Sequence, residues 1–216
     1  MNEDIVKQIT VGNLRLTIER DDNGTSPRDD DNFGTIAYKH RDYQLGEEKI
    51  DDPVDWLTRM LGLEEMEYEH TNGSLDELRS KFMDPEISGF IALPIYLFDH
   101  FGQTIATTPF GCRWDSGQVG YIYVSKDNVI KEYGDFSKDS QDKARSILEG
   151  EIKVFDQFIT GDVYGFREEK IIKCDACGHV EYEETDSCWG FYGDDWSANG
   201  ILYHISKCFH EELKKK

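Results

Sequence analysis

The sequence predicts a single α+β domain over residues 1–216, with an antiparallel or mixed sheet flanked by three to five helices. Segments of strand periodicity and of helical periodicity are interspersed, and the clearest strand pairs are joined by turns short enough for hairpins. Aromatic residues make up 12% of the chain, which favours a packed core. No stretch rich in proline, serine or glycine divides the chain.

Strand periodicity recurs along the whole chain. The segments that show it are 5–20, 34–40, 90–98, 103–108, 118–124, 163–173 and 179–192. A polar acidic loop, 21–32, separates the first two. We expect one hairpin around Gly102 and a second over 163–192, with a cysteine-bearing turn near 174–178.

Candidate helices follow residues that commonly cap helix N-termini, which are Asp52, Ser74 and Ser125. Glu77 completes a capping box with Ser74. The clearest helix is 140–160, where apolar residues recur on one face. The spacing of Ile201, Ile205, Phe209 and Leu213 predicts a C-terminal amphipathic helix.

The charge narrows the classes of partner. The chain has 44 Asp and Glu against 24 Lys and Arg, for a formal net charge of −20. Such a surface repels nucleic acids and anionic membranes and attracts basic proteins. Residues 1–20 show no signal peptide, and no apolar run approaches the roughly 18 residues of a membrane span. We therefore expect a cytoplasmic protein that binds neither nucleic acid nor membrane directly.

The acidic residues are clustered. One cluster lies between Gly46 and Glu69 and another over 181–195, where no Lys or Arg occurs. Candidate partner-binding acids are Glu47, Glu48, Asp51, Asp52, Asp55, Glu181, Glu183, Glu184, Asp194 and Asp195. A solvated surface without a partner is the alternative.

Two cysteines stand at zinc-ligand spacing in the sequence Cys174-Asp175-Ala176-Cys177-Gly178. A C-x-x-C-G turn aims two thiolates at one point, and four ligands complete a structural zinc site. Candidate metal ligands are Cys174, Cys177, Cys188 and Cys208, with His179, His204 or His210 as alternatives. The other interpretation is a hairpin turn with reduced thiols.

Two weaker patterns point to other chemistry. Residues 19–30 follow an imperfect calcium-binding loop frame, for which a solvated acidic loop is the alternative. Asp99, His100 and Cys112 form a nucleophilic site only if the fold brings them together. We expect Cys112 not to be catalytic, and no catalytic residue is assigned.

Aromatic residues gather near glycines over 161–166 and 187–196. Most are expected in the core. Tyr164, Trp189 and Trp196 are candidates for an exposed partner-binding anchor.

The block 93–126, LPIYLFDHFGQTIATTPFGCRWDSGQVGYIYVSK, together with GDVYGF and DSCWGFYG, resembles a family of uncharacterised proteins of bacteriophages and other mobile elements. The similarity covers most of residues 32–200. It implies an accessory protein that acts in the host cytosol, and it carries no catalytic role.

These observations predict an acidic accessory protein that binds and inhibits a host defence or nucleic-acid-processing protein, such as a nuclease, in part by nucleic-acid mimicry. One alternative is a small enzyme or a nucleotide- or small-molecule-binding protein that uses 93–126. Another is a structural or regulatory phage component.

Overall fold

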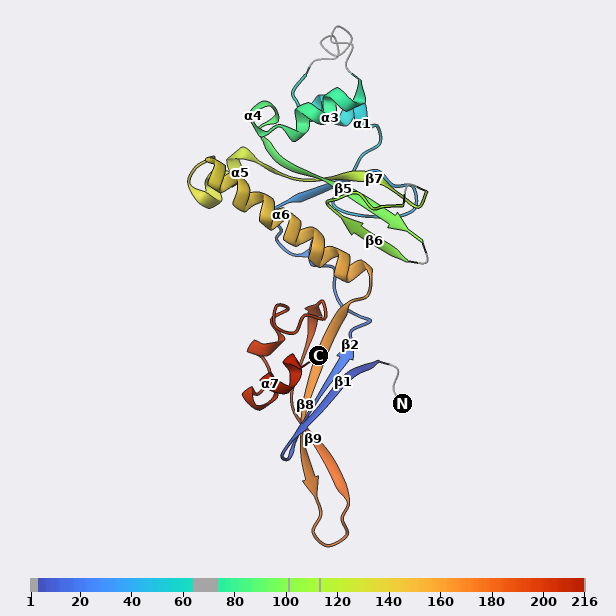
Figure 1. The fold of residues 1–216 in the computed structure, drawn as a ribbon, viewed down its shortest axis with the longest axis vertical. Coiled ribbons are helices and arrows are strands. Elements are labelled where there is room, and N and C mark those ends of the chain that lie inside the picture. Colours follow the sequence, from blue (N-terminus) through green and yellow to red (C-terminus); the bar gives the residue numbers. More distant parts are fainter. Residues whose placement is uncertain (1–3, 64–73, 101, 113, 216) are drawn as a thin grey trace. The chain divides into compact units, whose positions relative to one another are not determined.

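A computed structural model describes residues 4–63, 74–100, 102–112 and 114–215. Within it the chain forms two compact units. Unit 1 comprises residues 1–27 and 157–216, and unit 2 comprises residues 28–156. Each unit has its own sheet (Figure 1). The predicted α+β fold class is confirmed. The prediction of a single domain stays a prediction, because two compact units can still unfold together.

Unit 1 contains a four-stranded antiparallel sheet in the order β1-β2-β8-β9. Its strands are β1 (Ile5–Val11), β2 (Leu14–Arg20), β8 (Val163–Lys173) and β9 (Val180–Tyr192). The predicted single strand over 5–20 is therefore a hairpin. Gly12 adopts a φ of 62° at its turn, a conformation that glycine reaches without a steric cost.

The C-terminal segment covers one face of this sheet. Its elements are η2 (Ile201–Tyr203), η3 (Lys207–Phe209) and α7 (His210–Lys214). The predicted amphipathic helix is wrong as secondary structure, because two 3₁₀ turns precede a short α-helix. Its apolar residues are nevertheless buried against Leu16, Ile18 and Phe166. Glu168 fixes the bend, since its carboxylate accepts hydrogen bonds from the backbone N–H and the hydroxyl of Ser206.

Unit 2 is built on a five-stranded mixed sheet in the order β4-β3-β7-β5-β6. The strands are β3 (Thr35–Tyr38), β4 (Glu48–Lys49), β5 (Phe90–Asp99), β6 (Gln103–Ala106) and β7 (Ser116–Ser125). β5 and β6 form the predicted hairpin.

Helices lie on both sides of the unit 2 sheet (Figure 1). They are α1 (Pro53–Met60), α3 (Leu75–Met83), α4 (Pro85–Ser88), α5 (Lys126–Tyr133) and α6 (Lys138–Ile159), and a 3₁₀ turn, η1, spans Pro27–Asp29. The predicted caps are confirmed: Asp52, Ser74 and Ser125 accept hydrogen bonds from the first turns of α1, α3 and α5. The last residues of α6, from Gln157, belong to unit 1.

An aromatic cluster joins α1 and α3 to the sheet. The Trp56 ring stacks on Tyr121 and meets Phe82 edge to face. The Trp56 side chain is almost fully buried, and its indole N–H donates to Glu48 at 2.9 Å. This cluster is the core of one side of unit 2.

Candidate functional site

One face of the unit 1 sheet points away from the hydrophobic core of the unit. This face is polar and carries ion pairs between neighbouring strands. Arg15 on β2 pairs with Glu169 on β8 at 2.7 Å, and its guanidinium lies 3.4 Å from the centre of the Tyr182 ring. Arg167 pairs with Glu19 at 2.9 Å. These contacts link neighbouring strands and hold the long side chains in place.

Trp189 lies across this face because β8 has a glycine beneath it. A Cβ atom at Gly165 would lie 2.0 Å from the Trp189 ring, so no larger residue fits below the indole. Gly165 pairs in register with Glu19 on β2. Trp189 is 44% exposed. Because Gly165 has no side chain, one face of the indole lies close against this position of β8. The rest of the ring stays accessible to a ligand.

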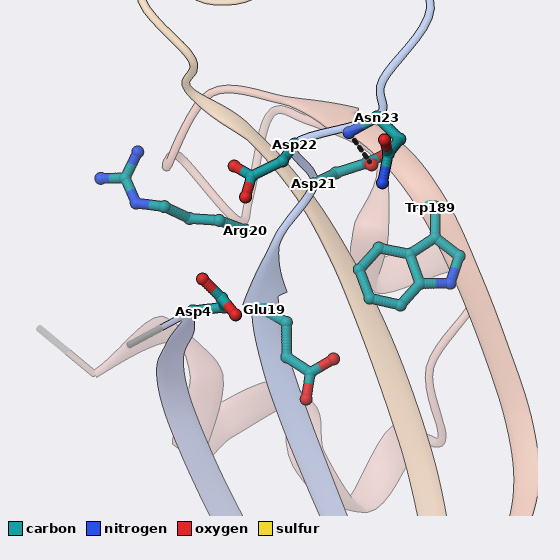
Figure 2. A pocket seen from close by; sticks show the side chains of 7 residues that line it. All are labelled: Asp4, Glu19, Arg20, Asp21, Asp22, Asn23 and Trp189. Carbon is teal, nitrogen blue, oxygen red and sulfur yellow. Dashed lines mark hydrogen bonds between the residues drawn. The ribbon is translucent and has the colours of Figure 1, made fainter. Parts of the chain in front are cut away.

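Four carboxylates line a pocket beside the exposed indole. Trp189 lines a pocket of about 520 Å³ together with Asp4, Glu19, Arg20, Asp21, Asp22 and Asn23 (Figure 2). Asp21 accepts a hydrogen bond from the Asn23 N–H at 3.1 Å, which shapes the turn after β2. Arg20 extends away from the indole (Figure 2) and donates to the Gly161 carbonyl at 3.1 Å.

The pocket is suited to a positively charged group. Within the described part of the chain, Asp4, Asp21 and Asp22 form no ion pair, while Glu19 is held by Arg167. An indole face attracts a cation, and nearby carboxylates add to that attraction. A lysine or arginine side chain of a partner has the charge and the length that such a pocket requires.

Of the other two predicted anchor aromatics, Tyr164 lies in the core and Trp196 is partly buried. Tyr164 is 4% exposed, and its hydroxyl donates to Asp162 at 3.3 Å. Trp196 meets it edge to face and packs against the unit 1 core. Of the three predicted anchors, Trp189 is therefore the most exposed, while Trp196 is partly buried and lines a second pocket.

Three of the predicted acids have structural roles in unit 2. Glu47 accepts a hydrogen bond from the Ile36 N–H and pairs with Arg28. Glu48 accepts from Trp56, Arg59 and Tyr123. Burial and the hydrogen bond to Glu48 raise the pKa of the Tyr123 hydroxyl. Asp52 caps α1.

The remaining acids of the first cluster are less isolated than the sequence indicates. Asp51 and Asp55 are exposed, but they share a pocket with the cations Lys49 and Arg59. The acids Glu64, Glu65, Glu67 and Glu69 lie outside the described residues. This cluster therefore presents fewer free carboxylates than its composition predicts.

The second cluster divides between two surfaces. Glu181, Glu183 and Glu184 are exposed along β9, an edge strand of the sheet. Asp194 and Asp195 line a different pocket with Lys7, Lys214 and Lys215. The β9 acids thus add to the negative charge of unit 1, whereas the latter pair lies among cations.

The structure brings together two of the four candidate zinc ligands. Hydrogen bonds to its sulfur lower the pKa of the Cys174 thiol. They come from the backbone N–H of Cys177, from the Cys177 side chain and from the Ala176 N–H. Cys188 is on β9 and Cys208 in η3. Among the described residues no three His, Cys, Asp or Glu side chains converge on a possible metal position, in the 19–30 loop or elsewhere. Zinc and calcium remain predictions.

Asp99, His100 and Cys112, the predicted nucleophilic arrangement, do not meet as predicted, because Cys112 and His100 both approach Asp115. The Cys112 thiol donates to the Asp115 carboxylate at 3.4 Å, and His100 Nδ1 lies 3.6 Å from the same oxygen. Asp99 instead accepts from the Tyr43 hydroxyl at 3.0 Å. The structure thus pairs Cys112 and His100 with Asp115 and not with Asp99.

We expect Cys174 to be alkylated by iodoacetamide faster than Cys112. Hydrogen bonds to its sulfur lower the pKa of Cys174, so its reactive thiolate is present at lower pH than in an ordinary cysteine. Mass spectrometry of alkylated peptides over a pH series measures both rates. Cys177→Ala removes the side-chain donor at position 177 and should slow the reaction at Cys174. Faster alkylation of Cys112 would instead support the enzyme alternative.

Sequence reasoning missed the pocket, although one signal was present. A glycine inside a strand often marks a close approach of another group, and Gly165 interrupts the pattern of β8. Asp4, just before β1, and Glu19 on β2 reach the pocket from positions that depend on which strands pair.

Comparison with protein-family models, with curated proteins and with solved structures finds no match to this chain. In the described residues no helix is both long enough and apolar enough to cross a membrane.

Proposed function

We propose that this chain is an acidic accessory protein of a mobile element that binds a basic surface of a host protein and thereby inhibits it. The observation that carries the proposal is the exposed Trp189 indole in one pocket with three aspartates that form no ion pair among the described residues. In this proposal a lysine or arginine side chain of the partner enters the pocket. The ammonium or guanidinium contacts the ring face, and Asp4, Asp21 and Asp22 neutralise its charge.

Inhibition follows if the basic surface is one that the partner uses for nucleic acid. Such surfaces bind phosphates through Lys and Arg side chains, and their affinity depends on charge. The exposed acids of β9 lie in the same unit as the pocket and supply further negative charge. The net charge of −20 also accelerates the approach of a basic partner. Bound in this way, the chain excludes nucleic acid from the site.

We expect Trp189→Ala to weaken binding of an oligo-lysine peptide by about fivefold, because it removes the ring that the cation contacts. Isothermal titration calorimetry of the full chain measures the affinity. Trp189→Phe should keep most of the binding. Trp114→Ala is the matched control, since Trp114 is 95% exposed and does not line the pocket.

The charge contribution is tested by combining Asp4→Asn, Asp21→Asn and Asp22→Asn. The affinity of this variant should fall less steeply with added salt than that of the unaltered chain, and association should slow more than dissociation quickens. If Trp189→Ala and Trp114→Ala have equal effects, the pocket is not the binding site. If an identified host partner still engages its nucleic acid when this chain is bound, the inhibition by mimicry is wrong.

A further inference from the structure

The hairpin of β8 and β9 extends past the rest of its sheet. β2 follows β8 only as far as the pair Leu14–Lys170, whereas β8 and β9 remain paired up to Lys173 and Val180 (Figure 1). We call residues 171–182 the arm. It is a two-stranded ribbon, and such a ribbon is marginally stable in water unless something packs on it.

Apolar side chains on the arm are open to solvent. Ile172 is 40% exposed, Val180 38% and Tyr182 48%. Between Ile171 and Val180 the ionised side chains are Lys173 and Asp175, so this stretch is nearly neutral in a chain of net charge −20. Two copies of the chain therefore repel each other less at the end of the arm than at the acidic clusters.

The turn at the end of the arm holds two thiols in a fixed arrangement. The Cys174 N–H donates to the His179 carbonyl at 2.8 Å, and the Gly178 N–H donates to the Cys174 carbonyl at 2.8 Å. Gly178 has a φ of 72°, which closes the turn. Cys174 and Cys177 are both exposed at this turn, three residues apart in sequence.

This pair has the ligand type and the spacing of half of a cysteine zinc site. Structural zinc is tetrahedral and usually has four ligands, often all cysteine thiolates. Among the described residues no third His, Cys, Asp or Glu joins the pair. Cys188 is paired with Phe166 in the sheet and packs against the core of unit 1, so it is not a ligand at this turn. The missing ligands must come from outside the turn, and a second copy supplies the same pair.

We propose that Zn²⁺ joins the arms of two copies of this chain, held by Cys174 and Cys177 of each in a Cys₄ site. A two-fold axis through the metal relates the copies, and Val180, which shares a face with Lys173 near the turn, packs near it. Each thiol loses its proton as its sulfur binds the metal, so binding releases protons and involves no oxidation.

The test uses the full chain under a reductant that does not bind metal, which excludes disulfide-linked dimers. Light scattering coupled to size-exclusion chromatography should show a monomer in chelator and a dimer after zinc is added. Elemental analysis of the dimer should give about one zinc per two chains. Cys174→Ser and Cys177→Ser should each abolish both the dimer and tight zinc binding.

Cys208→Ser is the matched control, because Cys208 is also exposed but lies in η3. It should dimerise with zinc as the unaltered chain does. About one zinc per monomeric chain would overturn the proposal in favour of a site closed within one copy. A dimer that persists in chelator, or protein that binds no zinc, would also overturn it. None of these outcomes bears on the Trp189 pocket.

Discussion

Arg28→Ala is expected to lower the free energy of unfolding of unit 2 by about 3 kcal/mol. The Arg28 side chain is 6% exposed and pairs with Glu47 at 2.6 Å and Glu151 at 2.9 Å. It also donates to the Gly34 carbonyl at 2.7 Å. Its removal leaves two partly buried carboxylates without this cation, and an uncompensated charge costs more than the pair contributes.

The Arg28 contacts also fix the segment that leads into β3. Glu151 on α6 accepts from the Phe33 N–H at 2.7 Å while it pairs with Arg28. Loss of the guanidinium should therefore loosen the edge of the sheet against α6. Hydrogen exchange of the β3 and β7 amides, followed by mass spectrometry in increasing urea, measures the change.

Arg41→Ala is the matched control, because Arg41 is 90% exposed and pairs with its neighbour Asp42. Exposed ion pairs contribute little, so this variant should lose less than about 0.5 kcal/mol. Equal losses in the two variants would contradict the structural role of Arg28. That role bears on function too, because Glu47, predicted to bind a partner, is already neutralised by Arg28 within its own unit.

Local signals explain the parts of the fold that the sequence predicts well. Asp52, Ser74 and Ser125 cap helices through hydrogen bonds within three residues, and Gly134 ends α5 with a φ of 88°. Such contacts depend on neighbouring residues alone. The hairpin of β5 and β6 follows from the same kind of local turn chemistry.

In the C-terminal segment, apolar periodicity predicts which residues are buried but not the backbone conformation. Ile201, Ile205, Phe209 and Leu213 recur every four residues and are all buried, as the pattern predicts. The backbone is nevertheless not one helix, because Ser206 is bonded to Glu168 on β8. A tertiary contact between residues far apart in sequence overrides the local preference.

The candidate site depends even more on distant contacts. Trp189, Gly165 and Glu19 meet because β8 lies between β2 and β9. Strand order is set by the packing of the whole sheet and is not encoded by spacing along the chain. For the same reason the sequence does not separate Trp189, which is accessible, from Tyr164, which is buried.

Phe209→Ala is expected to lower the free energy of unfolding of unit 1 by about 3 to 5 kcal/mol and to leave unit 2 protected. Phe209 is fully buried against the sheet of unit 1. Truncation of its ring leaves a cavity beneath the C-terminal segment. The segment is then attached only through Glu168 and the neighbouring apolar side chains. Hydrogen exchange should show faster opening of the β2 and β8 amides and unchanged exchange at β5 and β7.

Tyr203→Ala provides the control within the same segment, because Tyr203 is 92% exposed. It should change the stability of unit 1 by less than about 0.5 kcal/mol. The result also decides how the two compact units unfold. If Phe209→Ala speeds exchange equally in both units, they unfold as one cooperative domain, as the sequence predicts. If the loss is confined to β2 and β8, each unit is stabilised by its own core, and the Trp189 pocket depends on the core of unit 1 alone.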